Sequence, residues 1–402
     1  MTQIFGIVGK PSSGKSTFLN AACLTNAKMS EIPFTTIDAN KGIAYVKVKC
    51  ICKEFNVEDN PKNSFCIEGH RFIPINLLDV AGLVPDAHKG KGLGNKFLND
   101  LSRADVLLHI VDTTGTLDKT GKRCTIGEND PYEDISFLEK EIDFWVKDIL
   151  EREDWNKFSS SAKDKNALVK NLLKRLSGLK IKQQQIIMAL KNSKIENKLP
   201  SQWTDEEIFE FSKNIREISK PILILANKID KEISIKNLED LKKKYKGSII
   251  PCSALAEHYL RKYHEDKIID YIPGSVDFKI INPEKLSAKE LELITKIKTN
   301  ILEPFNGTGV QNALNYATFQ IANLICVYPV SDINTFSDNN NNVLPDVFLI
   351  KKGTLLKDFV RKKIHSDLAK HFIYGVDART KRRLGENYEL QHDDIIKIVS
   401  AK

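Results

Sequence analysis

The sequence predicts a doubly wound α/β domain with one antiparallel edge, interrupted by a helical insertion and followed by a C-terminal β-grasp domain. The α/β domain is indicated by apolar runs at 4–8, 105–112 and 222–227, which alternate with helical patterns. The insertion is indicated by about a hundred residues between Asp112 and Pro221 that carry the spacing of long helices. The β-grasp domain is indicated by short strands around one helix over 355–369.

The first motif occupies residues 9–16 and reads G-x-x-x-x-G-K-S. It lies between the apolar strand and a helix over 17–24, which is the setting that a phosphate loop requires. The glycines let backbone N–H groups turn toward a polyphosphate, and the helix N-terminus adds positive potential. Lys15 is expected to reach the β- and γ-phosphates, and the Ser16 hydroxyl to bind Mg²⁺. Taken alone, the motif is also compatible with a glycine-rich turn before an ordinary helix.

Residues 79–82 read D-x-x-G at the end of an apolar strand. Asp79 is expected to hold Mg²⁺ through water, and the Gly82 N–H to sense the γ-phosphate. This second motif follows the phosphate loop in the order that a nucleotide hydrolase requires, which argues against an ordinary glycine-rich turn.

Residues 227–230 read N-K-x-D after an apolar strand, and residues 251–254 read P-C-S-A after a shorter one. The Asp230 carboxylate can accept hydrogen bonds from N1–H and the 2-amino group of guanine. Adenine offers an acceptor at N1 and has no 2-amino group. Because a buried carboxylate left unpaired is costly, this site is expected to reject adenine. The backbone after the shorter strand suits guanine O6, so the set predicts GTP.

The spacing of the motifs resembles a particular group of GTPases. Residues 33–38 (P-F-T-T-I-D) lie where switch I belongs, and residues 79–94 form a long glycine-rich stretch. Together these resemble the Obg family, and within it the YchF-like (Obg-like) branch. The C-terminal part is similar to the TGS domain that closes those proteins, in residues 344–350, 377–383 and 393–398. The resemblance covers nearly the whole chain and is weakest in the middle.

The resemblance implies GTP hydrolysis with Mg²⁺, and an association with ribosomes or RNA. Thr36 is expected to be the second direct Mg²⁺ ligand by analogy. Leu83 stands where Ras-type proteins carry a water-orienting glutamine. The family shares this replacement, and leucine cannot orient water, so slow turnover is expected. Some members of the branch have an altered base motif and use ATP, whereas residues 227–230 keep the guanine form. Many potassium-stimulated relatives carry Asn in place of Ser12, which leaves potassium activation open.

These arguments define the expected site. The nucleotide-binding residues are Gly9, Pro11, Ser12, Ser13, Gly14, Lys15, Ser16, Thr17, Asn227, Lys228, Asp230, Ser253, Ala254 and Leu255. The catalytic residues are Lys15, Thr36 and Gly82, and the Mg²⁺ ligands are Ser16, Thr36 and, through water, Asp79.

Composition narrows the class of protein. A chain of 402 residues is long enough for two or three domains with proper cores. It contains no run of 18 apolar residues, so no membrane span is expected, and its first strand leaves no room for a signal peptide. Seven cysteines, an odd number in a large chain, are typical of the reduced thiols of a cytoplasmic protein. The protein is expected to be a monomer.

The insertion has an uneven charge. Residues 133–156 contain three Lys/Arg against nine Asp/Glu, a net of −6, and residues 157–198 contain eleven against two, a net of +9. The basic segment is expected to contact RNA or a ribosome, although its lysines could instead pair with the acidic helix and face water. A second basic cluster, residues 379–383, is expected on a surface loop, where a solvated turn explains it nearly as well.

Two heptad seams predict an antiparallel coiled coil in the insertion. The seams are Leu138, Ile142, Trp145 and Ile149, and Val169, Leu172, Leu176, Leu179, Gln183, Ile186 and Leu190. A helix over 162–194 would be roughly 50 Å long, with Ser177 and Gly178 able to bend or break it. A third helix is expected from Thr204. The expected divisions are 1–130 and 221–322 for the GTPase domain, 131–220 for the insertion and 323–402 for the TGS domain.

One histidine and one cluster of possible metal ligands lie outside this scheme. His109 within the strand 105–112 is expected to be a satisfied core histidine rather than a catalytic one. Cys50 and Cys52 are expected on one face of a strand, with Cys66 and His70 on the returning strand, so a zinc site is conceivable. Reduced thiols packed under a hairpin are the favoured alternative.

The expected function is a cytoplasmic GTPase that converts GTP and water to GDP and phosphate and acts as a switch on a ribosome or RNA. Two other classes stay open. One is an ATPase, as in some relatives, and the other is a nucleotide-gated binding protein with negligible turnover.

Overall fold

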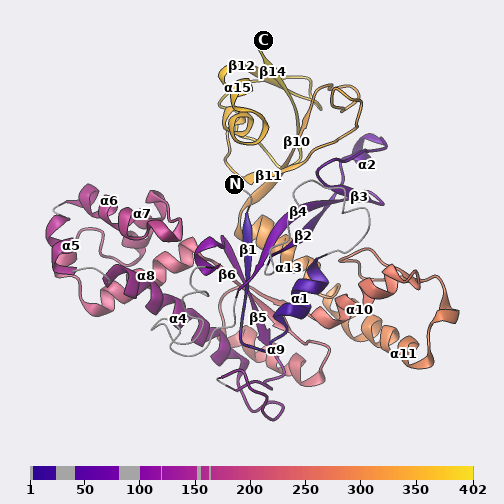
Figure 1. Ribbon diagram of the computed structural model, residues 1–402, viewed down its shortest axis with the longest axis horizontal. Coiled ribbons are helices and arrows are strands. Elements are labelled where there is room, and N and C mark those ends of the chain that lie inside the picture. The colour runs from indigo at the N-terminus through magenta and orange to yellow at the C-terminus, as the bar shows by residue number, and fades with distance from the viewer. Residues whose placement is uncertain are drawn as a thin grey trace.

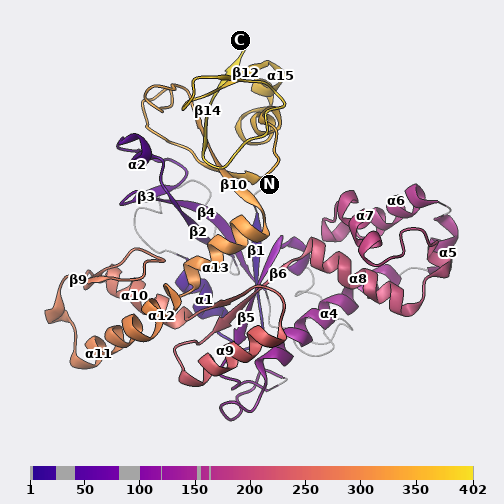
Figure 2. The ribbon, with the colours of Figure 1, turned by 180° about the vertical axis from the view of Figure 1, so that it is seen from behind.

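A computed structural model describes residues 3–23, 41–80, 100–118, 120–151, 155–162 and 164–401. Three bodies surround a central twisted sheet (Figure 1). The insertion helices extend to one side, a helical lobe with α10 and α11 extends to the other, and the C-terminal domain lies above. The view from behind shows α13 lying along the sheet between the lobe and the C-terminal domain (Figure 2).

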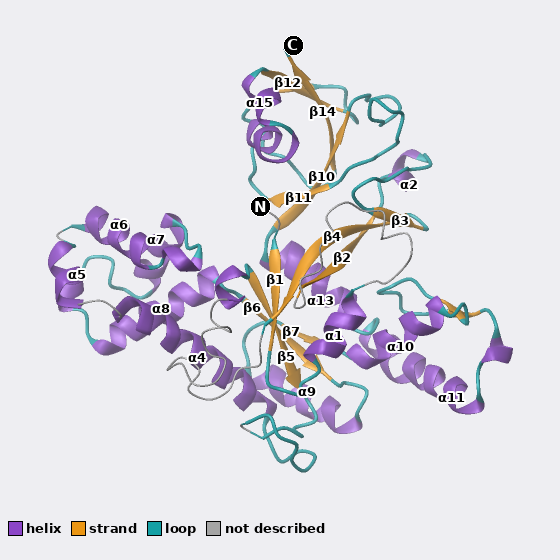
Figure 3. Cartoon of the chain, viewed as in Figure 1, coloured by secondary structure: helices purple, strands orange, loops and turns teal. Residues whose placement is uncertain are grey.

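The central sheet has seven strands in the order β2-β4-β1-β5-β6-β7, with β3 paired to β4. The strands β4, β1, β5, β6 and β7 run parallel to one another, whereas β2 and β3 run antiparallel to β4. The predicted doubly wound sheet with one antiparallel edge is therefore confirmed (Figure 3). The strands are β1 (Ile4–Val8), β2 (Lys41–Lys49), β3 (Phe65–Ile67), β4 (His70–Asp79), β5 (Val106–Asp112), β6 (Ile222–Asn227) and β7 (Ile249–Pro251).

Helices cover both faces of this sheet because its strands are apolar on both sides. Phe5 and Leu225 pack with α1 and α13 on one face, whereas Leu78 and Leu107 pack with the insertion on the other. The helices next to the sheet are α1 (Lys15–Ala22), α9 (Glu232–Lys244), α10 (Ala254–Glu265) and α13 (Val310–Tyr316). Residues 100–103, which precede β5, are also helical.

The lobe beyond α10 contains a two-stranded sheet and a long helix with a π-helical stretch in it. Its elements are β8 (Ile269–Asp270), β9 (Lys279–Ile280), α11 (Ala288–Ile297) and α12 (Glu303–Phe305). Ser287 caps α11 with Glu290, and a π-helical stretch, Lys298–Leu302, joins α11 to α12. Residues 288–305 therefore form one continuous helical stretch. A second π-helical stretch, Ala317–Ile321, follows α13.

The insertion folds as a compact helical bundle rather than a long arm. Its helices are α4 (Pro131–Glu151), α5 (Trp155–Ser161), α6 (Lys165–Arg175), α7 (Gln183–Asn192) and α8 (Asp205–Ser219). The prediction of one helix over 162–194 is wrong, because a 3₁₀ turn at Ser177–Leu179 and a left-handed Lys180 separate α6 from α7. The apolar residues of both seams are largely buried, but in a core shared with the sheet. Gln183 is exposed.

Polar side chains join the first and last insertion helices. Arg216 of α8 donates to both oxygens of the buried Asp143 of α4, at 2.8 and 3.2 Å. Thr204 caps α8, and its backbone N–H donates to Glu207, as the sequence predicted. None of the helices in the described ranges is both long and apolar enough to cross a lipid bilayer.

The C-terminal domain is the predicted β-grasp. Its five strands have the order β11-β10-β14-β12-β13, with β10 and β14 parallel. The strands are β10 (Leu324–Val330), β11 (Phe348–Lys351), β12 (Phe372–Asp377), β13 (Arg383–Leu384) and β14 (Asp394–Ser400). The helix expected over 355–369 is interrupted at His365, which is extended; its parts are α14 (Leu356–Phe359), a π-helical Val360–Ile364 and α15 (Ser366–Lys370).

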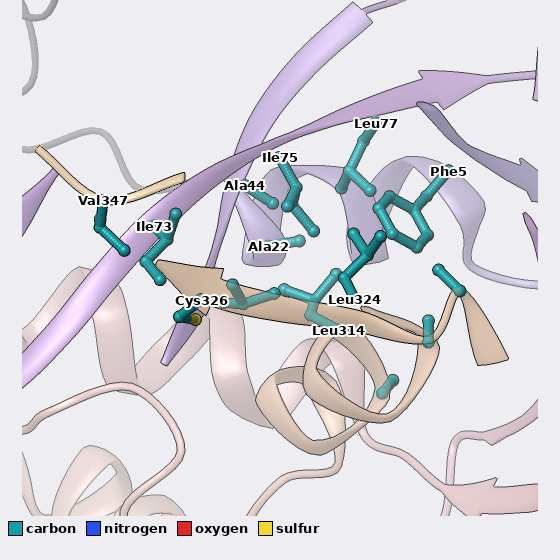
Figure 4. Close-up of a cluster of buried hydrophobic side chains, with 14 of the residues drawn as sticks. Phe5, Ala22, Ala44, Ile73, Ile75, Leu77, Leu314, Leu324, Cys326 and Val347 are labelled. Atoms are coloured by element: carbon teal, nitrogen blue, oxygen red, sulfur yellow. The ribbon is translucent and has the colours of Figure 1, made fainter. Parts of the chain in front are cut away.

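One hydrophobic core joins the central sheet to the C-terminal domain (Figure 4). Phe5 and Ile73 come from the sheet, Leu324 and Cys326 from β10, and Val347 from the loop before β11. Because all five side chains are buried in one cluster, the two domains pack as a continuous body along this line.

A buried arginine provides the polar part of this interface. Arg71 on β4 forms an ion pair with Asp59 at 2.9 Å. It also donates to the Ser64 hydroxyl and to the Leu344 carbonyl, each at 3.0 Å. The guanidinium therefore links the segment between β2 and β4 to the C-terminal domain.

The segment between β2 and β3 makes further contacts with the C-terminal domain. Arg379 donates to both carboxylate oxygens of Glu54, which lies in α2 (Cys52–Phe55), at 2.7 and 2.8 Å. The Asn60 N–H donates to the Val343 carbonyl at 2.8 Å. Arg379 is thus engaged between domains, and a solvated turn does not describe this member of the 379–383 cluster.

The buried position of Arg71 predicts a large loss of stability for Arg71→Ala. Removing it leaves Asp59 without its buried ion-pair partner and the Leu344 carbonyl without a donor, which should cost about 3–5 kcal/mol. Arg379→Ala is the matched control, since the half-exposed Arg379–Glu54 pair should contribute no more than about 1 kcal/mol. Urea unfolding of the full chain measures both variants, and equal losses would contradict the assignment.

Candidate nucleotide site

The phosphate loop can only be built with glycine at two positions. Gly9 has a φ of 145°, and a Cβ there would lie 2.4 Å from the Ile110 carbonyl oxygen on β5. Gly14 has a φ of 104°, and a Cβ there would lie 2.3 Å from the Asn227 side-chain nitrogen on β6. The loop therefore runs directly against the carboxyl ends of two neighbouring strands, which is where parallel sheets bind ligands.

The side-chain amide of Asn227 connects three of the predicted motifs. Its nitrogen donates to the Ser13 carbonyl at 2.9 Å, and its oxygen accepts from the Ala254 N–H at 3.1 Å. The amide is buried, so both hydrogen bonds are shielded from water. The phosphate loop, the N-K-x-D motif and the start of α10 are thereby held in one arrangement.

Lys228 is anchored by a carboxylate that lies outside the predicted motifs. Its ammonium donates to Asp112 at 2.8 Å, and the hydroxyls of Thr114 and Thr116 donate to the same carboxylate at 2.6 and 2.7 Å. Burial alone would raise the pKa of Asp112, but these donors lower it below its ordinary value. The sequence could have indicated Asp112 as a site residue, because it ends the apolar strand β5 at the same sheet edge as Asn227.

Asp230 closes the N-K-x-D motif and has one oxygen already oriented. Oδ1 accepts a hydrogen bond from the Ser253 hydroxyl at 2.8 Å, and Oδ2 lies 3.4 Å from the Lys231 ammonium. The Asp230 side chain is 21% exposed, which leaves it accessible to a ligand. Ser253 also caps α10, Ala254 is buried, and Leu255 is 46% exposed.

Lys15 and Asp79 influence each other's charge at the phosphate loop. The Lys15 ammonium donates to the carbonyls of Gly9 and Lys10 at 3.0 and 2.8 Å. Burial lowers the pKa of Lys15, partly offset by Asp79, and burial raises the pKa of Asp79, partly offset by Lys15. Oδ1 of Asp79 is buried and has no hydrogen-bond partner among the described residues.

This pair fits a magnesium site. A buried carboxylate oxygen without a donor, next to the phosphate-loop lysine, suits a hydrated cation that prefers oxygen ligands. The Ser16 hydroxyl lies in the exposed first turn of α1 and is available as a direct ligand. Thr36, Gly82 and Leu83 lie outside the described residues.

Three family models match successive parts of the chain. Residues 4–142 match the 50S ribosome-binding GTPase model. Residues 225–332 match the model of the Obg-like GTPase YGR210-like, G4 motif-containing domain, and residues 341–400 match the TGS domain.

A GTP-binding protein of Methanocaldococcus jannaschii is 46% identical over 400 residues, covering 99% of both chains. The chain belongs to the Obg-like family of GTP-binding proteins, in its YchF-like branch. The human Obg-like ATPase 1 is 26% identical over 97% of this chain and 90% of its own. The crystal structure of a GTP-binding protein from Pyrococcus horikoshii is 37% identical, with a TM-score of 0.77 over all of both chains. The Schizosaccharomyces pombe YchF GTPase shares the fold, with 18% identity and a TM-score of 0.59 over 99% of this chain and 98% of that one.

In this Obg-like chain, a buried ion pair ties the phosphate loop to the insertion. Lys10 of the loop pairs with Asp134 in the first turn of α4 and donates to the Asp118 carbonyl at 2.9 Å. Burial raises the pKa of Asp134, and the Lys10 ammonium offsets only part of that shift. Sequence reasoning missed this pair, because position 10 is an unconstrained x in the motif and its partner lies 124 residues away.

His109 lies in β5 below the phosphate loop of this Obg-like protein. It is buried, as expected, but it is not satisfied, since Nδ1 has no hydrogen-bond partner in the described part of the chain. Burial, together with the charges of Lys15 and Lys10, lowers the pKa of His109 to about 3. The imidazole is therefore neutral at physiological pH.

The lowered pKa of His109 predicts a loss of stability in acid. The unfolded imidazole titrates near about 6.5, so below that pH the unfolded chain takes up a proton that the folded chain refuses. The free energy of unfolding should then fall by up to about 1.4 kcal/mol per pH unit as the pH drops toward about 3, and this contribution should be constant above about 6.5.

Urea unfolding at about pH 7.5 and about pH 5 tests this contribution. His109→Gln keeps a polar side chain that cannot titrate, so the difference between the two pH values should shrink. A difference equal to that of the wild type would assign the acid sensitivity to other groups.

Proposed function

We propose that this protein is a Mg²⁺-dependent GTPase that hydrolyses GTP slowly to GDP and phosphate and acts as a nucleotide switch on a ribosome or RNA in the cytoplasm. The main support is Asp230, which is preoriented by Ser253 and joined through the Asn227 scaffold to the phosphate loop. None of the seven cysteines, all of which lie in the described part of the chain, forms a disulfide, which suits a reducing compartment.

Guanine recognition follows from the accessible carboxylate of Asp230, whose side chain is 21% exposed. Ser253 fixes Oδ1, so the carboxylate is already aimed when the base arrives, and less ordering is required on binding. N1–H and the 2-amino group of guanine can both donate to the carboxylate. Adenine would leave it facing an acceptor, and the penalty for such an unpaired charge favours GTP over ATP.

Phosphate binding requires Lys15 to exchange partners. Its ammonium donates to the carbonyls of Gly9 and Lys10 in this structure. The β- and γ-phosphates would take the place of these carbonyls, because a charged acceptor forms the stronger hydrogen bond. Backbone N–H groups at the start of α1 would add further donors to the phosphates. Mg²⁺, held by Ser16, by Thr36 and through water by Asp79, would neutralise charge on the phosphates.

Slow turnover is expected from the residue that stands in the place of a water-orienting glutamine. Leu83 cannot hydrogen-bond to the nucleophile, and the buried His109 lies under the loop with a pKa too low for a general base near neutral pH. The rate enhancement would come from Lys15, Mg²⁺ and the loop amides, which stabilise charge as it develops on the phosphates.

The base contact predicts a change of nucleotide preference for Asp230→Asn. Guanine affinity should fall at least about tenfold, because the variant cannot form the two charge-assisted hydrogen bonds. The affinity of the variant for xanthosine triphosphate should rise, because the asparagine amide can donate to the xanthine 2-oxygen and accept from N1–H. Side-by-side titration of GTP, ATP and xanthosine triphosphate measures this, and equal binding of ATP and GTP by the wild type would favour the ATPase alternative.

Hydrolysis is tested separately with Lys15→Ala. Single-turnover measurements should show no phosphate release in this variant and a larger loss of affinity for GTP than for GDP. Unchanged turnover would remove the phosphate loop from the mechanism. Negligible turnover in the wild type, both alone and with ribosomes, would favour a nucleotide-gated binding protein.

The insertion supports the proposed RNA or ribosome contact. Lys170, Lys174 and Lys182 are exposed and form no ion pair with a described residue. Arg175 and Lys180 have structural roles instead, because Arg175 lies 4.4 Å from the Phe158 ring and Lys180 donates to a backbone carbonyl. The surplus of positive charge is therefore carried by side chains that are available to phosphates.

Changing Lys170, Lys174 and Lys182 to glutamine should weaken binding to purified ribosomes. The slope of log affinity against log salt should flatten by about 0.7–0.9 for each phosphate that the variant no longer neutralises. The matched control changes the exposed Lys236, Lys242 and Lys246 on and after α9. An equal effect of both variants would indicate nonspecific attraction, and an unchanged slope would exclude the insertion as the contact.

A further inference from the structure

Four potential metal ligands converge beside the start of β4. Ligand atoms of Cys50, Cys52, Cys66 and Asp59 all lie within 4.8 Å of one another. The Cys52 and Cys66 sulfurs are 3.9 Å apart, and the Cys50 sulfur lies 3.1 Å from an Asp59 oxygen. His70, the fourth residue suggested by the sequence, is not part of this group, and Asp59 takes its place.

The local backbone explains why these ligands meet. The expected strand ends at Lys49, so Cys50 lies in a turn and Cys52 starts the short helix α2. Cys66 comes from β3, and Asp59 comes from the loop between α2 and β3. A turn, a short helix, a loop and a strand thus each contribute one ligand. The alternation of side chains along a single strand would not bring these four ligands together.

The spacing suits a tetrahedral zinc ion. Zinc–sulfur bonds of about 2.3 Å place two thiolates of a tetrahedral site about 3.8 Å apart, close to the separation of Cys52 and Cys66. A disulfide requires about 2.05 Å between sulfurs, so the two thiols are not bonded to each other. A zinc–oxygen bond of about 2.0 Å would place sulfur and oxygen about 3.5 Å apart, slightly more than the hydrogen-bonded distance from Cys50 to Asp59.

The surroundings supply the orientation and charge that a metal site needs. Arg71 is fully buried and holds Asp59 through the ion pair described above. A partner that binds a ligand carboxylate in this way fixes the direction in which the carboxylate faces the metal. Three thiolates and one carboxylate carry four negative charges, and a divalent cation together with Arg71 would leave a net charge of −1.

We propose that Cys50, Cys52, Cys66 and Asp59 bind a structural Zn²⁺ ion that holds the segment between β2 and β3 in the conformation that docks the C-terminal domain. Four protein ligands close the coordination shell, so the site is structural rather than catalytic. It lies at the His70 end of β4, and Asp79 lies at the other end, about 30 Å away along the strand. The metal site is therefore separate from the nucleotide site.

The docking role follows from the contacts of the same segment. The Asn60 and Lys62 N–H groups donate to carbonyls of the C-terminal loop, and Asn63 donates to the Val347 carbonyl at 2.9 Å. The regular structure around them consists of a four-residue helix and a three-residue strand. So small a unit has little core of its own, and small units of this kind commonly need a metal or a disulfide.

Metal content and spectra of the full chain test the proposal. The chain purified in zinc without chelator should contain about one Zn²⁺, and Cys66→Ser should lower this at least about tenfold. Cys124→Ser is the matched control, since Cys124 is a free thiol outside the cluster, and it should retain the metal. Unchanged zinc in Cys66→Ser would overturn the proposal.

Cobalt substitution of the wild type keeps the test valid if the cysteine variants fail to fold. Co²⁺ at this site should give a thiolate-to-metal charge-transfer band and the intense visible bands of tetrahedral coordination. Absence of these bands, with all seven thiols titratable, would overturn the proposal. So would a loss of two titratable thiols without reductant, because it would show a disulfide. Chelation should also lower the unfolding temperature of the wild type.

Discussion

The side-chain amide of Asn227 is the constraint on which the rest of the nucleotide site depends. It donates to the phosphate loop at Ser13 and accepts from the start of α10 at Ala254, so the loop, β6 and α10 cannot move independently. The same amide lies where a side chain at position 14 would lie, which makes glycine obligatory there. Base recognition and phosphate binding are therefore not separate modules. The base-binding motif and the phosphate loop both contact the side-chain amide of Asn227, which is buried.

The β2–β4 region connects this site to the C-terminal domain. β4 carries Asp79 at one end and Arg71 near the other, and Arg71 hydrogen bonds across the domain boundary. The apolar core around Ile73 and Leu324 continues over the same boundary. A β-grasp domain joined only by a linker would reorient freely, whereas this one is held by a shared core and a buried guanidinium.

The parts of the structure that sequence could predict are those governed by local pattern. Strand–loop–helix order, the capping of α8 by Thr204 and the parallel sheet follow from periodicity and motifs. The prediction of one helix over 162–194 was wrong because a seven-residue apolar repeat continues through a chain reversal without changing. The local sign of the break was the pair Ser177 and Gly178, where the structure has a 3₁₀ turn. Lys10–Asp134 and the role of Asp59 could not be predicted, since each depends on partners that only the fold brings together.

The attachment of α4 to the phosphate loop has a geometric consequence. Its first turn is fixed by Lys10, and the 21-residue helix runs without interruption into the bundle. At the rise of an α-helix, its length is about 31 Å, so a tilt of about 10° at Asp134 displaces the opposite end by about 5 Å. Because Arg216 clamps α8 to the middle of α4, the two helices would swing together. Any such tilt would have to move against the core that α4 shares with the sheet, so the direction of the whole insertion is tied to the phosphate loop.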